Sequence, residues 1–125
     1  MTMGAFKAEM SRGEIKVKEV LEFAGLLFEQ QYIFPDLKAS NGLPLRFDFA
    51  VFDEDGGLDF LIEYNGEQHY TAVAAYGGGR KLAQQKHNDA AKMRYCSKHG
   101  ISLIIIPYYD YEKIDLEYIF EKAGI

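Results

Sequence analysis

Residues 45–64 read LRFDFAVFDEDGGLDFLIEY, two apolar runs separated by a short acidic and glycine-containing segment. Runs rich in β-branched and aromatic residues predict strands, and an Asp-Gly pair between two such runs predicts an antiparallel hairpin. Whether the turn is formed by residues 55–56 or by residues 54–57, the numbers of paired residues have the same sum. The hairpin therefore places Asp48 opposite Glu63, with both side chains on one face of the sheet.

Two acids opposed in this way repel each other unless a cation lies between them. Mg²⁺ and Mn²⁺ prefer oxygen ligands, and such an ion neutralises a phosphate and lowers the pKa of a bound water during phosphodiester hydrolysis. The sequence therefore predicts a metal-dependent hydrolytic site at Asp48 and Glu63. Two alternatives stay open, namely a bulge that shifts the register and two solvated carboxylates neutralised by Arg46 and Lys38.

A third acid lies on the first predicted helix. Apolar residues follow helical spacing over 12–29, and Glu14 lies on the same stripe as these apolar side chains. An acid on the core-facing stripe points toward the sheet, so Glu14 is a candidate to join the two hairpin acids. The alternatives are a capping box with Ser11 at the start of the helix, or an ion pair with Lys18 four residues on.

The remaining predicted helices and strands give a mixed α/β fold. In chain order we expect a short strand over 30–34 that Pro35 ends, a glycine-rich loop over 77–79, a helix over 80–98 that Gly100 ends, a buried strand over 101–106 that Pro107 ends, and a helix over 115–123. With the first helix and the hairpin, the predicted order is αβββαβα in one domain spanning 1–125.

The composition excludes several classes of protein. A net charge of -5 and an isoelectric point near 5.2 argue against a protein that coats nucleic acid through a basic surface, although bound divalent metal offsets a carboxylate-rich centre. A single cysteine, Cys96, excludes an internal disulfide framework, and the three histidines lack zinc-ligand spacing. Neither a signal peptide nor a membrane-spanning apolar run is visible, so we expect a soluble cytoplasmic protein.

Several segments together resemble a known nuclease family. Glu14, the strand aspartate in LRFDFAV and the segment EYNGEQH (63–69) are similar to the PD-(D/E)XK nuclease superfamily. The likeness is greatest to its very-short-patch-repair-like branch, whose small domains carry an E-x-D-G-x-x-H-like segment. Residues 85–108, QKHNDAAKMRYCSKHGISLIIIPY, resemble the branch's pattern D-x-x-K-x-x-Y-C, followed by a glycine, a buried strand and Pro-Tyr. The resemblance covers most of the chain, from about Glu14 to Tyr108.

This resemblance implies a restriction-endonuclease-like αβββαβ core, with a mixed central sheet flanked by helices, and DNA hydrolysis that leaves a 5′-phosphate and a 3′-hydroxyl. It implies that Asp48, Glu63 and the backbone carbonyl of Tyr64 bind Mg²⁺ or Mn²⁺. Glu14 would bind or orient a metal-bound water. His69 matches the histidine of the branch, a candidate to activate water or protonate the leaving group near neutral pH.

One position departs from the family pattern. The superfamily lysine is replaced by Asn65, which can form hydrogen bonds but adds no charge, and the aspartate usual in the branch is also missing there. Gln68 and His69 rank first among the residues that could take over the role of the lysine, because they lie in the motif itself. Lys86 and Lys92 are further candidates.

The helix predicted over 80–98 is the most basic part of the chain. Its candidate contacts to nucleic-acid phosphates are Arg80, Lys81, Lys86 and Lys92. The alternative is a solvated helix face on which Asp89 and Lys92 pair with each other.

From these observations we expect a metal-dependent endonuclease that acts on duplex or branched DNA. The alternative is a catalytically weak or inactive nuclease-fold module that binds nucleic acid or a protein partner, because the motif lysine is absent and the charge is acidic. No recognition module is visible in the sequence. We therefore expect structure-selective cutting at nicks, junctions or mismatches, or recognition supplied by a homodimer or a separate partner.

Overall fold

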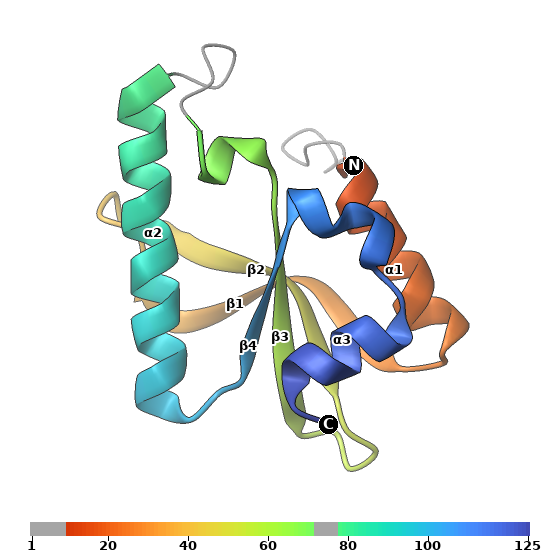
Figure 1. The fold of residues 1–125 in the computed structure, drawn as a ribbon. Coiled ribbons are helices and arrows are strands. Elements are labelled where there is room, and N and C mark those ends of the chain that lie inside the picture. The colour runs from red at the N-terminus through yellow and green to blue at the C-terminus, as the bar shows by residue number, and fades with distance from the viewer. Residues whose placement is uncertain (1–9, 72–77) are drawn as a thin grey trace, which may run out of the picture.

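The computed structural model describes residues 10–71 and 78–125, which form a four-stranded mixed sheet with helices on both faces (Figure 1). The strands lie in the order β1-β2-β3-β4, with antiparallel pairing between the first three and parallel pairing of β4 with β3. In chain order the elements are α1 (Arg12–Phe23), β1 (Leu27–Lys38), β2 (Pro44–Phe52), β3 (Leu58–Asn65), the 3₁₀ helix η2 (Glu67–His69), α2 (Gly78–His99), β4 (Leu103–Pro107), the 3₁₀ helix η4 (Tyr108–Lys113) and α3 (Leu116–Ala123).

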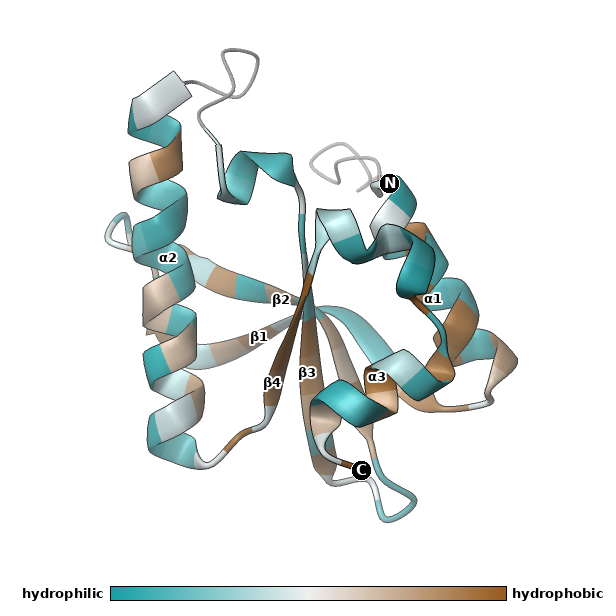
Figure 2. Cartoon of the chain, in the orientation of Figure 1, coloured by the Kyte–Doolittle hydropathy of each residue, from teal (hydrophilic) through white to brown (hydrophobic). Residues whose placement is uncertain are grey.

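Apolar side chains fill two layers, one on each face of the sheet. Helices α1 and α3 cover one face, where Val17 and Ile119 pack against strand residues such as Ile62. Helix α2 covers the other face, where Cys96 packs against Leu61. Figure 2 shows apolar residues concentrated in β3 and β4 and polar residues along much of α2. No helix within residues 10–71 and 78–125 has the length and apolar character needed to cross a membrane.

The β2–β3 hairpin has the predicted register but a different turn. Phe49 pairs with Ile62 and Ala50 pairs with Leu61, which gives the expected sum of residue numbers. The loop is longer than predicted, and the pairing shifts between Val51 and Phe52. Within this loop the Asp53 carboxylate accepts hydrogen bonds from the amides of residues 55 and 57, both at 2.9 Å. An extra residue at the shift compensates for the longer loop and restores the register.

The first helix is shorter than predicted. It ends at Phe23 rather than continuing to residue 29, because Gly25 adopts a left-handed φ of 71° that stops the helix. Leu27 and Phe28 continue the helical spacing in the sequence but begin β1 instead. The strand predicted over 30–34 extends to Lys38, and Pro35 is accommodated within it because β1 is an edge strand.

The second half of the chain follows the prediction more closely. Helix α2 begins two residues before the predicted start, and Gly100 ends it with a φ of 67°. Of the predicted glycine loop, residue 77 lies outside the described residues, whereas Gly78 and Gly79 begin α2. The buried strand starts at Leu103 rather than residue 101, and Pro107 belongs to it rather than ending it. The last helix lies where predicted, with Asp115 as its N-cap.

The side chains of β2 pack in different layers before and after Asp48. Gln31 of β1, in the register position opposite Asp48, has a φ of 53°. Before this point Phe47 packs in the layer under α2, and after it Phe49 packs in the layer under α1. Residues two apart in a regular strand share one face, so the backbone twists sharply at residue 48. This twist places Asp48 at the boundary between the two layers.

We expect the conformation of Gln31 to limit stability. A left-handed backbone costs an L-residue about 1–2 kcal/mol, and a β-branched side chain tolerates it less well than glutamine does. Gln31→Val is therefore expected to lower the free energy of unfolding by about 1–2 kcal/mol in urea titrations. The matched variant Gln31→Gly is expected to be at least as stable as the original chain. Equal losses in both variants would contradict the argument.

Candidate active site

A polar cavity of about 270 Å³ lies where α1, β2, β3, η2 and α2 meet. All five residues predicted to be catalytic line this cavity: Glu14, Asp48, Glu63, Gln68 and His69. Lys92 also lines it, whereas Arg80, Lys81 and Lys86 are exposed on α2 and do not. The structure therefore gathers residues from four separate stretches of sequence around one small space.

The carboxylates of Asp48 and Glu63 lie between β2 and β3, next to the Phe49–Ile62 pair of the hairpin. The amide of Tyr64 donates a hydrogen bond to Asp48 Oδ2 at 2.7 Å, and the amide of Asp48 donates one to Glu63 Oε2 at 2.9 Å. Each acid thus accepts a hydrogen bond from the backbone of the opposite strand. These bonds fix both carboxylate groups, and both side chains line the same cavity.

Asp48 is an acid whose charge the protein does not fully compensate. Burial raises its pKa well above the ordinary value of 3.8, and the negative charges of Glu63 and Glu14 raise the pKa further. The hydrogen bond from the Tyr64 amide opposes this shift only in part. A buried acid flanked by two other acids is an environment that favours a bound cation or a proton.

Glu63 has a cationic partner on α2. Lys92 Nζ donates a hydrogen bond to Glu63 Oε1 at 3.1 Å, and both side chains are buried. Burial raises the pKa of Glu63, while the charge and hydrogen bond of Lys92 act in the opposite direction. Lys92 is therefore separate from the exposed basic residues of α2, and its predicted contact with a phosphate stays a prediction. The alternative in which Lys92 pairs with Asp89 is not observed among the described residues, where its ion pair is with Glu63. The ammonium group of Lys92 lies in the interior, where it forms an ion pair with the buried Glu63 carboxylate.

Glu14 combines two arrangements that the sequence presented as alternatives. It completes the capping box, because its Oε1 accepts from the amide of Ser11 at 2.9 Å and its own amide donates to Ser11 Oγ at 3.2 Å. The same side chain lines the cavity and influences Asp48. The alternative pair with Lys18 is not formed, since Lys18 contacts Glu22 at 3.6 Å.

His69 is held by an acid that the sequence analysis did not select as a site residue. Its Nδ1 lies 3.0 Å from Asp89 Oδ2, and Gln85 Nε2 donates to Asp89 Oδ1 at 3.2 Å. Burial alone would raise the pKa of Asp89, but the hydrogen bond and charge of His69 lower it below the ordinary value. This contact orients the imidazole and leaves Nε2 available. The aspartate in the D-x-x-K pattern was the sequence signal for this role.

Two positions in the 63–69 segment have specific packing. Asn65, at the place of the superfamily lysine, is buried, and its Oδ1 has no hydrogen-bond partner within residues 10–71 and 78–125. A Cβ atom at Gly66 would lie 2.7 Å from Gln68 Oε1, so the glycine lets Gln68 fold back toward the cavity. On the other wall, a Cβ at Gly13 would lie 1.9 Å from the ring of Tyr64. Glycine is therefore required at position 13, whereas a side chain at position 66 would displace only the flexible end of Gln68.

The donor set suits a hard divalent cation. Asp48, Glu63 and the Tyr64 carbonyl provide oxygen ligands, which Mg²⁺ and Mn²⁺ prefer. In the part of the chain that the structure describes, no three acidic, histidine or cysteine side chains already surround a single point. The predicted set contains two such side chains and one backbone oxygen, and the uncompensated charge of Asp48 supports its fit to a cation.

Three viral proteins are similar to this chain. Uncharacterized protein 033L of Invertebrate iridescent virus 3 is 31% identical over 114 residues, which are 86% of this chain and 54% of that protein. Uncharacterized protein 094L of Frog virus 3 (isolate Goorha) is 45% identical over 53 residues, 41% of this chain and 34% of that protein. Uncharacterized protein 307L of Invertebrate iridescent virus 6 is 28% identical over 75 residues, 59% of this chain and 36% of that protein.

The chain thus spans between about a third and about half the length of these curated relatives. No family model matches the chain, and no solved structure matches it.

Proposed function

We propose that this chain is a metal-dependent nuclease with a restriction-endonuclease-like core, and that it hydrolyses phosphodiester bonds of DNA at the Asp48 cavity. One observation carries the proposal. Asp48 is buried beside two further acids, Glu63 and Glu14, in an open polar cavity that also holds an ammonium group and an imidazole. Like charges concentrated in this way destabilise a fold unless they serve a cation.

Asp48, Glu63 and the Tyr64 carbonyl would hold Mg²⁺ or Mn²⁺. When bound, such an ion supplies charge neutralisation at the phosphate and a lowered pKa for the attacking water. Glu14 lies beside Asp48 and is anchored through Ser11, so it can accept a hydrogen bond from that water and direct its lone pair at phosphorus. The oxygen of the water forms a bond to phosphorus while the bond to the 3′-oxygen breaks.

Lys92 would stabilise the negative charge that develops on the phosphate, and His69 would protonate the leaving group. The Lys92 ammonium group, held at Glu63, can donate a hydrogen bond to a phosphate oxygen as negative charge develops there. Asp89 accepts a hydrogen bond from Nδ1 of His69 and would stabilise the imidazolium form, which can deliver its Nε2 proton to the departing 3′-oxygen. The Glu14 carboxylate would take up the proton that the attacking water loses. The products are a 5′-phosphate and a 3′-hydroxyl. Lys92 therefore replaces the missing motif lysine in this proposal, ahead of Gln68.

DNA contacts beyond the cavity would come from the exposed basic residues of α2. Arg80, Lys81 and Lys86 are exposed on the half of α2 that begins near η2 (Figure 1). Their charges can pair with phosphates on either side of the cleaved bond, which offsets the acidic balance of the chain locally.

One observation favours a second candidate, a module that binds nucleic acid or a protein without cutting. Asp48 and Glu63 already accept hydrogen bonds from protein donors, so the described residues satisfy part of their charge without a metal. Calorimetric titration with Mn²⁺ separates the two candidates. A nuclease requires uptake of Mn²⁺ that the Asp48→Asn variant loses, whereas a binding module requires none.

Cleavage assays test the proposed function directly. Purified chain with Mg²⁺ or Mn²⁺ is expected to cut at least one member of a panel of nicked, mismatched, flap, four-way-junction and single-stranded DNA, with 5′-phosphate products. EDTA and the variant Asp48→Asn are each expected to abolish cutting. Asp59→Asn is the matched control, because Asp59 is an exposed acid on β3 and undergoes the same change of charge. Cutting by Asp48→Asn at the rate of the original chain would refute the proposal.

A further inference from the structure

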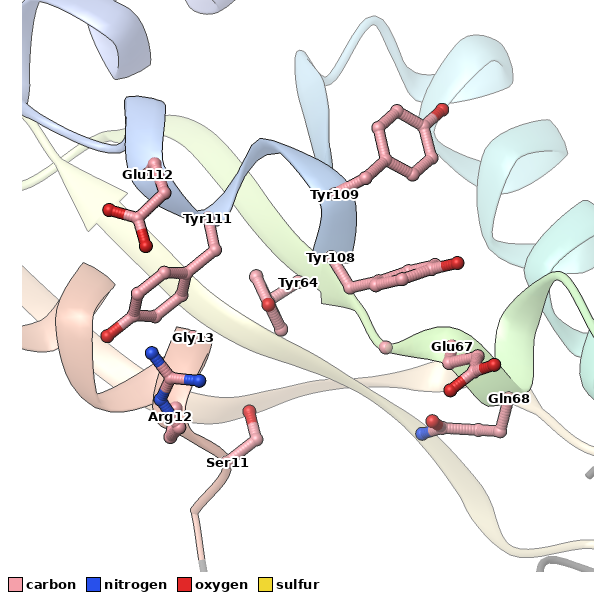
Figure 3. A pocket seen from close by; sticks show the side chains of 11 residues that line it. Ser11, Arg12, Gly13, Tyr64, Glu67, Gln68, Tyr108, Tyr109, Tyr111 and Glu112 are labelled. Atoms are coloured by element: carbon pink, nitrogen blue, oxygen red, sulfur yellow. The ribbon is translucent and has the colours of Figure 1, made fainter.

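A second pocket of about 500 Å³ adjoins the acidic cavity (Figure 3). Three stretches of sequence line it, residues 11–13 at the start of α1, residues 64–68 around η2 and residues 108–112 of η4. Its size falls within the range of pockets that enclose small ligands. None of the residues that face only this pocket has a role in the proposed hydrolysis, so the pocket needs its own explanation.

The two spaces share part of their lining. Ser11, Tyr64, Gly66 and Gln68 line both the acidic cavity and the second pocket. A phosphodiester bound at Asp48 would therefore have a neighbouring nucleotide at the mouth of the second pocket. The walls of this pocket are placed to contact that nucleotide and not the reacting phosphate itself.

Aromatic rings dominate one side of the pocket. Tyr108 and Tyr109 lie with ring centroids 5.5 Å apart, and Tyr70 lies 5.8 Å and 5.9 Å from them. Tyr109 is 68% exposed. Tyrosine rings clustered on an accessible surface offer stacking faces to a planar ligand, and nucleobases stack on such rings without regard to sequence.

Charged groups complete the pocket in a way that suits one nucleotide. The Arg12 guanidinium lies 4.3 Å from the centroid of the Tyr111 ring, where Figure 3 also shows it, and Lys16 Nζ lies 4.5 Å from the same centroid. Arg12 lines the pocket, and its guanidinium can pair with a phosphate there, whereas Lys16 Nζ donates a hydrogen bond to the Tyr111 carbonyl at 2.7 Å. Glu67 and Glu112 also line the pocket. Their carboxylates would repel a continuous phosphate backbone but can accept hydrogen bonds from the amino groups of a base.

We propose that this pocket, the tyrosine pocket, binds the unpaired base of a nucleotide adjacent to the cleaved bond. A base within a continuous duplex is stacked on both faces and enters a concave pocket only by flipping out of the stack, which costs energy that an unpaired base does not spend. The chain would therefore prefer DNA with an unpaired nucleotide at the cleavage position, such as a single strand, a flap or a bulge. This inference rests on the proposed function, since the acidic cavity defines which nucleotide reaches the pocket.

Binding of short labelled DNA in Ca²⁺, followed by fluorescence anisotropy, tests the inference. Three probes are compared, namely a single strand, the same strand with abasic sites throughout, and the corresponding blunt duplex. The single strand is expected to bind most tightly. Tyr108→Ala and Tyr109→Ala are each expected to weaken its binding by about 5- to 100-fold, the effect of losing one base–aromatic stack. The Phe variants at both positions are expected to retain it.

Phe23→Ala is the matched control, because Phe23 is 97% exposed and lies at the opposite end of α1 from the pocket. The inference would be overturned if the abasic and base-bearing strands bound equally well. It would also be overturned if both alanine variants bound the single strand as tightly as the original chain. Parallel cleavage assays separate the two proposals. Cutting of continuous duplex that the tyrosine variants leave unchanged refutes the pocket and retains the nuclease, whereas base-dependent binding without cutting refutes the nuclease alone.

Discussion

Replacing Lys92 by methionine is expected to reduce DNA cleavage by about 10²- to 10³-fold, the usual effect of removing one group that stabilises developing charge. Lys92 Nζ lies 3.1 Å from Glu63 Oε1 within the acidic cavity. Its ammonium group is the only lysine or arginine charge lining that cavity in the part of the chain that the structure describes. Methionine keeps the length and apolar stem of the side chain but removes the charge.

The same change also affects folding, so a second variant is needed. Loss of one partner from a buried ion pair costs about 3–5 kcal/mol, because the remaining charge is left without compensation. Lys92→Met is therefore expected to lower the free energy of unfolding at neutral pH. In the double variant Lys92→Met/Glu63→Gln neither group is charged, and much of this stability is expected to return. Because Glu63→Gln removes a proposed metal ligand, the double variant reports on stability alone. The cleavage rate is therefore measured on Lys92→Met itself, at a temperature where circular dichroism shows that this variant is folded.

A relocated lysine provides a positive test. Asn65 occupies the place of the superfamily lysine, and together with Glu63 and Lys92 it lines a small pocket that is separate from the acidic cavity. Its buried Oδ1 has no hydrogen-bond partner within the described residues. Asn65→Lys in the Lys92→Met background is expected to restore part of the cleavage rate. Phe23→Lys in that background is the control, because Phe23 is 97% exposed at the end of α1 that lies away from the cavity. Full activity of Lys92→Met alone would contradict the role assigned to Lys92.

The position of Lys92 also shows where the sequence was informative and where it was not. The register that brings Asp48 beside Glu63 follows from alternation and turn chemistry, which are local, and the structure reproduces it despite a longer turn. Lys92 was predicted both as one of the phosphate contacts of this basic helix and as a candidate for the role of the missing lysine. The structure buries it on the same helix face as Cys96, four residues on, and this spacing distinguishes it from Arg80, Lys81 and Lys86.

Contacts between elements far apart in the chain could not be predicted from the sequence. The pairing of His69 with Asp89 depends on how η2 packs against α2, and nothing in the local sequence specifies that distance. The early end of α1 had a different cause. Leu27 continues the helical spacing of apolar residues, so periodicity extended the helix, whereas the left-handed conformation of Gly25 ended it. Backbone conformation prevailed over the apolar pattern there.

The strand pairing in the mixed sheet explains why the site forms between β2 and β3. Strand β3 pairs with β2 on one side and with the parallel strand β4 on the other, so β3 is held along its length. The twist at Gln31 and Asp48 redirects β2 where its backbone pairing with β3 ends, and the carboxylates occupy the space between the two strands. Acids fixed by backbone amides in this way need little reorganisation to receive a cation, which lowers the cost of binding one.

Asp48→Asn is expected to stabilise the metal-free chain at neutral pH while abolishing its function. Asn keeps the shape of the side chain, and its carbonyl oxygen can still accept the hydrogen bond from the Tyr64 amide. It removes a buried negative charge from beside Glu63 and Glu14. The gain in the free energy of unfolding is expected to be about 1–3 kcal/mol, comparable to the cost of an unsatisfied buried polar group.

The pH dependence of this gain follows from the raised pKa of Asp48. The folded chain holds the Asp48 proton to a higher pH than the unfolded chain, whose pKa lies near the ordinary value of 3.8. The folded state therefore binds more protons in the interval above 3.8, and stability falls as pH rises through the raised pKa. Below that interval Asp48 is protonated in both states, so the original chain and Asp48→Asn are expected to converge in stability.

Thermal unfolding from about pH 3 to pH 8 in EDTA measures this difference, with Asp59→Asn as the control at an exposed acid of β3. The control is expected to follow the original chain at every pH. Adding Mn²⁺ at neutral pH is expected to raise the melting temperature of the original chain and to leave that of Asp48→Asn unchanged, because the Asp48 carboxylate is needed to bind the ion. A lower melting temperature for Asp48→Asn than for the original chain at neutral pH would show that the charge of Asp48 stabilises the fold. The cation-binding role would then lose its physical basis.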